Sequence, residues 1–233
     1  DIFEFVYFAR PDSVLLGQSV NEVRRRLGEE LAKEHSIEAD VVVPVPDSSI
    51  PAALGFASAS GIPFDMGIIK NRYIHRTFMR PNNILRDQDF KMKLNPMPQV
   101  IKGKRVVLVD DSIVRGNTMK KIVKMLYRIG AKEVHVVVSS PPVLYPDFYG
   151  INISSQKELI ASYMSHDEIR KHIGAESLSY LSFDGMIKAT GLPANTFSAS
   201  CFDGIYPIKI GENQKNIQKI SMHESKLWNL SRH

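Results

Sequence analysis

The sequence predicts an α/β fold in which a parallel, twisted sheet is flanked by helices, with a small, mostly helical extension at the C-terminal side. Valine-rich runs at 41–43, 106–109 and 134–138 are typical of strands covered on both faces. Helical patterns separate these runs, and such alternation favours parallel pairing with right-handed crossovers. With 233 residues, of which 43% are hydrophobic, the chain can bury a core of this kind.

The first half of the chain alternates strand and helix. Aromatic and β-branched residues over 2–9 predict a strand. Apolar residues at helical spacing then predict a helix over 19–35, which begins at Ser19 with a glutamate three residues later, a capping-box pattern. Residues 41–43 predict a buried strand, and residues 50–59 form the helix that returns from it.

The second half repeats the alternation and then weakens. After the strand at 106–109, a helix is predicted over 118–129, with Gly130 as its C-cap, before the strand at 134–138. Beyond residue 139 the expected elements are short: helices over 156–162, 165–173 and 183–190, and a strand over 179–181. The polar tail, 211–233, is expected to be poorly ordered, so that residues 1–210 form the domain together with its extension.

Positive charge is concentrated in one segment. The whole chain carries 30 Lys and Arg against 25 Asp and Glu, but the stretch from Lys70 to Arg105 has ten basic residues and two acidic ones. A cluster of this kind indicates a local anion, and no basic recognition helix is present, so neither nucleic acid nor a membrane is an expected partner.

Cysteine usage and the N-terminal residues predict a cytoplasmic, soluble protein. The single cysteine, Cys201, cannot form an internal disulfide, which favours a reducing compartment. The apolar run 2–9 is too short for a membrane span and lacks the pattern of a signal peptide. Because Asp1 adjoins a predicted strand and no Met precedes it, we expect a piece of a longer chain.

The main functional signal is the loop that follows the strand at 106–109. Asp110 and Asp111 come first, and small polar residues then lead through Gly116 to a helix start. Ligands of parallel α/β sheets bind at the carboxyl ends of the strands, and free amides at a helix start can hold a phosphate. The paired carboxylates can hold ribose hydroxyls or Mg²⁺. Two acids alone commonly just begin a loop. The full succession of strand, two aspartates, small polar residues, Gly116 and Thr118 favours a ribose 5-phosphate site instead. The loop is not a Walker motif, because no Gly-Lys-Ser/Thr follows.

This loop resembles the phosphoribosyl pyrophosphate (PRPP) binding motif of the type I phosphoribosyltransferases. Further strings resemble, in unbroken order, the synthetase half of the glutamine PRPP amidotransferases. These strings are Phe5–Ser13, Pro46–Ser49, Lys70–Phe78, Val109–Thr118 and Ser139–Pro142. The likeness runs from Asp1 to about Ile208 and implies the type I phosphoribosyltransferase fold.

The resemblance also implies a reaction and its partners. Ammonia attacks C1 of PRPP to give 5-phosphoribosylamine and pyrophosphate, the first committed step of de novo purine nucleotide biosynthesis. Displacing pyrophosphate builds charge on both fragments, so Mg²⁺ and cations are required. In the full-length family the ammonia comes from glutamine, and the family implies homo-oligomers and purine nucleotides as inhibitors.

Site residues follow from the same resemblance. Residues implied to bind PRPP are Asp47, Ser48, Ser49, Asp110, Asp111, Ser112, Ile113, Val114, Arg115, Gly116, Asn117 and Thr118. Residues implied to hold the metal are Ser48, Asp110 and Asp111, and those implied to be catalytic are Lys70, Arg72 and Tyr73, on a loop that closes over PRPP. From the residues alone, Pro46–Ser49 is more often a plain helix N-cap. A solvated basic surface is the usual interpretation of a charge run such as Lys70–Pro81, but the interleaved Asn71, Tyr73 and Phe78 and the match to the family favour the closing loop.

The sequence departs from the family pattern in three respects. Nothing resembles the N-terminal glutaminase half, and Cys201 has no histidine motif beside it, so this chain is expected to use free ammonia or a glutaminase segment in cis or trans. The four cysteine positions of the family's iron–sulfur cluster fall at Asp1, Asp147, Ser198 and Cys201; a cluster needs four soft ligands, so none is expected. His75 stands where a small residue is usual in the closing loop.

Two alternatives differ from this interpretation in testable ways. A salvage phosphoribosyltransferase, which joins a nucleobase to PRPP, would share residues 110–118 but lack the string Lys70–Phe78 and the C-terminal extension. A PRPP-sensing regulator of nucleic acid would carry a basic recognition helix or an added DNA-binding segment.

Overall fold

The central element of the computed structural model is a parallel four-stranded sheet. The structure describes residues 1–71, 94–149, 155–211 and 217. The strands are β3 (Val41–Pro44), β6 (Arg105–Asp110), β7 (Glu133–Val138) and β8 (Ser177–Tyr180), in the order β3-β6-β7-β8. All three neighbouring pairs are parallel, with Pro44 opposite Val109 and Asp110 opposite Val138. The predicted fold class is confirmed.

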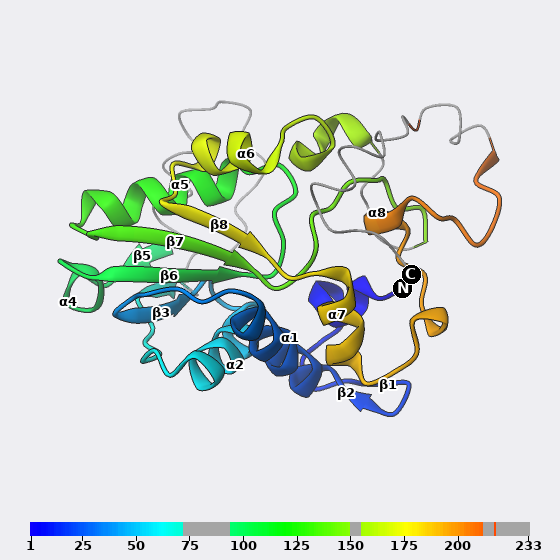
Figure 1. Ribbon diagram of the computed structural model, residues 1–233, viewed down its shortest axis with the longest axis horizontal. Helices are drawn as coiled ribbons and strands as arrows, with labels where there is room; N and C mark the ends of the chain where they lie inside the picture. The colour runs from blue at the N-terminus through cyan, green and yellow to red at the C-terminus, as the bar shows by residue number, and fades with distance from the viewer. Residues whose placement is uncertain (72–93, 150–154, 212–216, 218–233) are drawn as a thin grey trace.

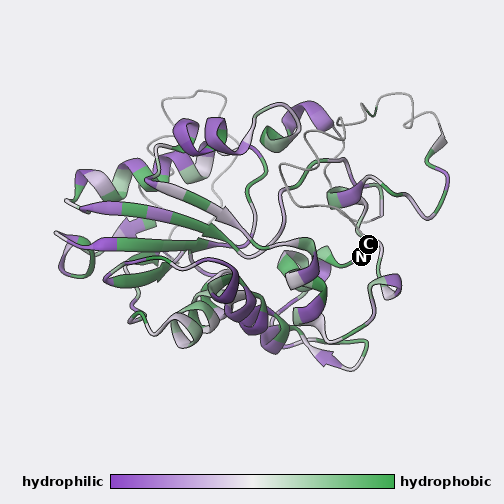
Figure 2. Cartoon of the chain, in the orientation of Figure 1, coloured by the Kyte–Doolittle hydropathy of each residue, from purple (hydrophilic) through white to green (hydrophobic). Residues whose placement is uncertain are grey.

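Helices cover both faces of this sheet (Figure 1). One layer holds α1 (Val20–Glu34), α2 (Ile50–Ser60) and α7 (Phe183–Thr190), and the other holds α5 (Asn117–Arg128) and α6 (His166–Ile173). The strand side chains alternate between the layers. Val42 packs in the hydrophobic cluster on the side of α1, α2 and α7, whereas Val41 and Val43 pack in the cluster on the side of α5 and α6. Burial on both faces explains why the strand sequences are continuously apolar. Figure 2 shows this contrast between the hydrophobic strands and the hydrophilic surface of α1.

Two glycines let α1 and α2 approach very closely. A Cβ atom added at Gly28 would lie 1.8 Å from the Ala52 carbonyl oxygen, and one added at Gly55 would lie 1.9 Å from the Arg25 carbonyl oxygen. Any side chain at either position would therefore force the helices apart. This contact fixes α1 over the start of α2, next to the loop that follows β3.

Shorter elements complete the described structure. The segments β1 (Val14–Leu15) and β2 (Gln18–Ser19) form one antiparallel pair, and β4 (Ile68–Lys70) and β5 (Leu94–Pro96) form another. The short helices are α4 (Pro98–Ile101), α8 (Ser200–Asp203) and the 3₁₀ turns η2 (Gln156–Glu158), η3 (Ile160–Ser162) and η4 (Ala194–Thr196). Among the described residues, none of the helices is long and apolar enough to cross a membrane.

The predicted strand over residues 2–9 is wrong. Residues Glu4–Phe8 form a π-helical turn, η1, instead. Ile2, Phe5 and Val6 are buried, which is helical spacing, whereas Tyr7 and Phe8 are about half exposed. The aromatic content favoured a strand, but this spacing of three and four residues decided the structure.

The other predicted elements are confirmed, with small changes at their ends. Ser19 caps α1 by accepting a hydrogen bond from the Glu22 amide at 3.4 Å. Gly130 follows the end of α5 with a positive φ of 98°. The predicted helix over 156–162 is two 3₁₀ turns, η2 and η3. Of the tail, 212–216 and 218–233 lie outside the described residues.

Candidate active site

Two loops meet at the carboxyl edge of the sheet because β3 and β6 are parallel neighbours. The loop after β3 contains Asp47, Ser48 and Ser49, and the loop after β6 begins with Asp111. The Val45 amide donates to the Val109 carbonyl at 2.9 Å, which extends the pairing beyond the strand ends. The peptide between Pro46 and Asp47 is cis. The register thus places two groups of polar side chains together that lie far apart in the sequence.

Serine hydroxyls from the first loop bond the carboxylates of the second. Ser48 Oγ donates to Asp111 Oδ2 at 2.6 Å, and Ser49 Oγ donates to Asp110 Oδ1 at 3.1 Å. Asp110 Oδ1 also accepts the Asp111 amide at 2.9 Å, and Ser112 Oγ donates to Asp111 Oδ1 at 2.8 Å. Both acids are therefore held in fixed orientations by neutral donors.

The two carboxylates form an electrostatically unfavourable pair. Burial raises the pKa of Asp110 well above its usual range, and the neighbouring Asp111 charge raises it further. Burial also raises the pKa of Asp111, which the hydrogen bonds from Ser48 and Ser112 oppose. A bound cation would relieve this repulsion. One or two carboxylates completed by phosphate oxygens are a typical Mg²⁺ environment, so Asp110, Asp111 and Ser48 fit this metal.

Residues 112–118 lead from the carboxylates into α5. Gly116 is the N-cap of this helix, with a positive φ of 72° and no side-chain hydrogen bond to the first amides. An uncapped helix start leaves backbone N–H groups available to an anion. The start of α5 therefore leaves backbone N–H groups free for an anion, and the assignment of residues 112–118 to a phosphate stays a prediction.

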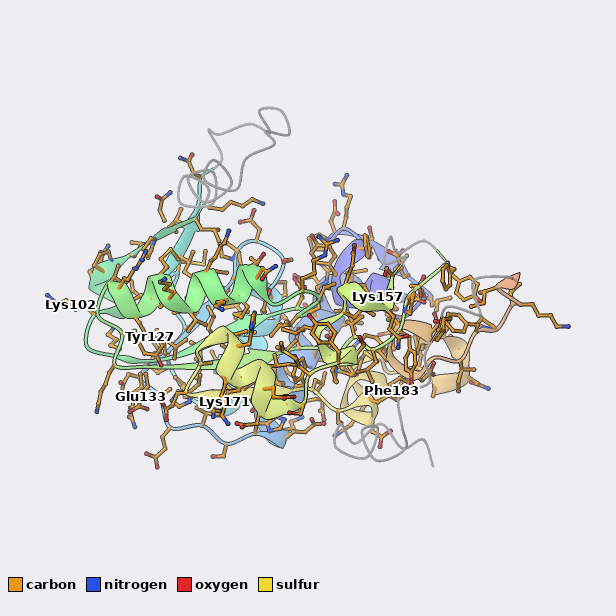
Figure 3. All side chains as sticks on the ribbon, turned by 90° about the horizontal axis from the view of Figure 1, so that it is seen from above. Lys102, Tyr127, Glu133, Lys157, Lys171 and Phe183 are labelled. Atoms are coloured by element: carbon orange, nitrogen blue, oxygen red, sulfur yellow. The ribbon has the colours of Figure 1, made fainter. Side chains whose placement is uncertain are left out.

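A second segment braces this loop from outside. The Ile160 amide donates to the Val114 carbonyl at 2.8 Å, and a Cβ at Gly116 would lie 2.8 Å from Ile160 Cδ1. Arg115 forms an ion pair with Glu158 of η2. In Figure 3, Lys157 of η2 lies toward the end where α5 begins, and Tyr127 toward the opposite end.

Lys70 is the one predicted catalytic residue that the structure describes. It ends β4, and its Nζ lies 3.3 Å from Asp47 Oδ2. The contact brings a cation to the loop that follows β3. Arg72 and Tyr73 lie outside the described residues, as does His75.

Most of the predicted site lines one cavity of about 480 Å³. Ser48, Asp110, Asp111 and residues 112–118 all contribute to its wall, whereas Asp47 and Ser49 do not. The sequence analysis missed further lining residues: Phe3, Tyr7, Phe8, Val45, Met119 and Glu158. Had residues 2–6 been interpreted as helical, Tyr7 and Phe8 would have been predicted as exposed aromatic residues. The local sequence gives no indication that Glu158 lines the cavity.

The four positions of the family's iron–sulfur ligands come from segments that meet in space, but their chemistry does not suit a cluster. The Ile2 amide donates to the Ser198 carbonyl, and the Leu144 amide to the Cys201 carbonyl, both at 2.9 Å. Asp147 Oδ2 accepts a hydrogen bond from Ser200 Oγ at 2.7 Å, so this carboxylate already has a hydrogen-bond partner in the structure. Cys201 is buried, and burial raises its thiol pKa. One thiol with two carboxylates and a hydroxyl does not fit an iron–sulfur cluster.

These features are typical of a class of protein: α/β domains with a candidate phosphate loop at the carboxyl edge of a parallel sheet. A family model for the phosphoribosyl transferase domain matches residues 16–142. The chain belongs to this family, and its fold is the type I phosphoribosyltransferase fold.

Closer relatives narrow the comparison. The chain is 52% identical to the amidophosphoribosyltransferase of Bacillus subtilis over 211 residues, which is 89% of this chain and 44% of that protein. It is 51% identical to the Synechococcus elongatus amidophosphoribosyltransferase, over 92% of this chain and 43% of that protein. A solved structure of the B. subtilis glutamine PRPP amidotransferase, complexed with ADP and GMP, matches with a TM-score of 0.84 over 91% of this chain and 47% of that chain. This chain thus spans less than half the length of these relatives.

Proposed function

We propose that this chain transfers the 5-phosphoribosyl group of PRPP to ammonia, forming 5-phosphoribosylamine and pyrophosphate at the start of purine nucleotide biosynthesis. One observation carries the proposal: Ser48 and Ser49 bond Asp111 and Asp110 beside an uncapped helix start, at the edge where β3 and β6 end. Similarity to amidophosphoribosyltransferases over about nine-tenths of the chain supports it.

Each part of the site has a role in this reaction. The amides of residues 112–118 hold the 5-phosphate, and Asp110 and Asp111 face the ribose, where positive charge develops as the bond from C1 to pyrophosphate breaks. Lys70, near Asp47, supplies a cation for the departing pyrophosphate. We assign the other two catalytic positions to Arg72 and Tyr73. When bound at Asp110, Asp111 and Ser48, Mg²⁺ would neutralise part of the leaving group's charge.

Ammonia is the proposed nitrogen donor for this stretch of chain. Glutamine hydrolysis in a cysteine amidotransferase needs an accessible thiolate, but Cys201 is buried and its thiol pKa is raised. A glutaminase segment, in cis or trans, would supply ammonia from glutamine. We also propose that the chain works without an iron–sulfur cluster, because only one of the four corresponding ligand positions is a cysteine. These positions are Asp1, Asp147, Ser198 and Cys201.

Regulation and assembly extend the proposal. Purine nucleotides carry a ribose phosphate like that of PRPP, and the B. subtilis structure contains ADP and GMP. We propose that such nucleotides compete with PRPP for the amides of 112–118 and inhibit the reaction. We further propose a homo-oligomer, in which residues 1–210 form the transferase domain and 211–233 a tail.

The test is pyrophosphate release from PRPP and Mg²⁺, with ammonium chloride, glutamine or a nucleobase as the acceptor. Release that requires ammonium supports the proposal, whereas release stimulated only by a nucleobase indicates a salvage enzyme. The double variant Asp110→Asn, Asp111→Asn should be folded but inactive, and unchanged turnover would refute the assigned role. Asp167→Asn is the control, since Asp167 pairs with Arg170 and Lys171 on the surface of α6.

A further inference from the structure

A buried arginine connects α1 to the N-terminal aromatic turn. Arg24 is 3% exposed, and its Nε donates to the Phe5 carbonyl at 2.9 Å. Its Nη2 donates to the Ala9 carbonyl at 2.8 Å and lies 3.4 Å from the Glu4 carbonyl. These carbonyls belong to both ends of η1, so one guanidinium holds the whole turn. Only arginine presents several donors in a planar fork that can bond separate acceptors in this way.

The turn that Arg24 holds carries an aromatic wall. This aromatic wall consists of Tyr7 and Phe8, whose ring centroids are 5.3 Å apart. The wall borders the cavity that contains Asp110 and Asp111, and also a second cavity of about 470 Å³ on the Arg24 side. Ser48 borders both cavities as well. The wall therefore stands between the proposed sugar site and a second open space.

The two rings of the aromatic wall are packed on only about half of their surface. Tyr7 and Phe8 are 46% and 45% exposed, and Phe3 supplies their neighbouring ring contacts, at 6.5 Å and 5.8 Å. The position of the wall consequently depends on its backbone, which Arg24 fixes through three carbonyls. Burial lowers the pKa of the Arg24 guanidinium, while the Asp111 charge acts in the opposite direction.

We propose that Arg24 is a positioning residue for the transfer reaction: by fixing the turn Glu4–Phe8, it holds Tyr7 and Phe8 beside the sugar site and keeps water from C1. This inference rests on the proposed function. It assigns Arg24 no contact with substrate. A loosened wall admits water, so PRPP is hydrolysed to ribose 5-phosphate and pyrophosphate without ammonia.

The test compares Arg24→Lys with wild type by the share of pyrophosphate release that does not need ammonium. Lysine keeps the charge but has no planar fork, so this share should rise about threefold or more. Arg24→Gln, which leaves no unpaired buried charge, should behave similarly and serves if the lysine variant does not fold. Arg25→Lys, at the next position of α1, is the matched control and should keep the wild-type share. A share is independent of the fraction of active protein, so a merely structural defect would not change it.

Two further measurements decide whether Arg24 acts through the wall. Phe8→Leu should raise the same share, and its effect should not add to that of Arg24→Lys, because both changes disable one element. Hydrogen exchange of the amides of residues 4–9 should quicken in Arg24→Lys, with the rest of α1 still protected. An unchanged share, additive effects or unchanged exchange would each overturn the inference while wild type remains active. Absence of PRPP turnover in wild type would instead refute the proposed function, and the inference with it.

Discussion

Ser48 Oγ lies 2.6 Å from Asp111 Oδ2, although the two residues are 63 positions apart in the sequence. The bond joins the loop after β3 to the loop after β6, and Ser112 Oγ donates to the other carboxylate oxygen of Asp111 at 2.8 Å. Parallel pairing of β3 with β6 brings the loops together. The cation site that we propose is therefore built across two loops rather than within one.

Ser48→Ala should weaken the proposed site without unfolding the protein. A hydrogen bond to a charged group contributes about 1.5–3 kcal/mol, so kcat/KM for PRPP should fall roughly 10- to 100-fold, with a higher Mg²⁺ requirement. Pyrophosphate release at several Mg²⁺ concentrations measures both effects. Ser165→Ala is the control, because Ser165 caps α6 away from the cavity and should affect stability alone. Equal activity of the two variants would contradict the role of Ser48.

Alanine substitutions at Gly116 and Gly61 distinguish the effect of backbone strain from that of steric conflict. Both have a positive φ, of 72° and 74°, but an added Cβ at Gly116 would lie 2.8 Å from Ile160 Cδ1, whereas none of the described atoms comes within 4 Å at Gly61. Gly61→Ala should cost about 1 kcal/mol of unfolding free energy, and Gly116→Ala about 2–4 kcal/mol. Urea unfolding measures these costs. Calorimetry should show weaker binding of ribose 5-phosphate for Gly116→Ala alone; similar losses in both variants would argue against a phosphate role for 112–118.

The sequence predicted those parts of the fold that depend on local pattern. The valines of 41–43 and 106–109 identify buried strands because both faces of the sheet are covered. Residues 110–118 could be singled out as a candidate phosphate loop because they are contiguous in the sequence, whereas their bonds to Ser48 and Ser49 depend on the pairing of β3 with β6. Contacts that depend on how elements pack were not predictable. Glu158 reaches the cavity through a turn that braces Val114, and Arg24 reaches η1 across the chain. The N-terminal turn was misassigned because aromatic content outweighed the spacing of Ile2, Phe5 and Val6.

Cys201 should be inert in the native protein. It is fully buried, and burial raises its thiol pKa, so little thiolate forms and reagents have no access to it. Ellman's reagent should react slowly with the native chain and detect one thiol per chain after unfolding in guanidinium.

Iron and sulfide assays on anaerobically purified protein should be blank. Stoichiometric iron would show that the ligand interpretation at Asp1, Asp147, Ser198 and Cys201 is wrong.

The opposite end of the sheet offers a prediction about stability and pH. Asp40 stands before β3 and accepts hydrogen bonds from Arg105, the first residue of β6: from its amide at 2.7 Å and from Nη2 at 3.0 Å. The Arg105 guanidinium lowers the pKa of Asp40 to about 2. The unfolded carboxyl has its ordinary pKa, near 3.8. Because the folded pKa is the lower one, the stabilising contribution is complete above the unfolded value and is lost as the pH falls from there toward 2.

Asp40→Asn should consequently lower the urea midpoint of unfolding at pH 6. The difference in midpoint between wild type and this variant, the midpoint gap, should be smaller at pH 4 and smaller still at pH 3. Asp12→Asn is the control, because Asp12 pairs with Arg10 on an exposed turn, where ion pairs contribute little. Its midpoint should stay near wild type at each pH. A gap for Asp40→Asn that is the same at pH 6 and pH 3 would mean that the Asp40 contact stabilises the strand ends through neutral hydrogen bonding, since an ionised carboxylate must lose its contribution on protonation.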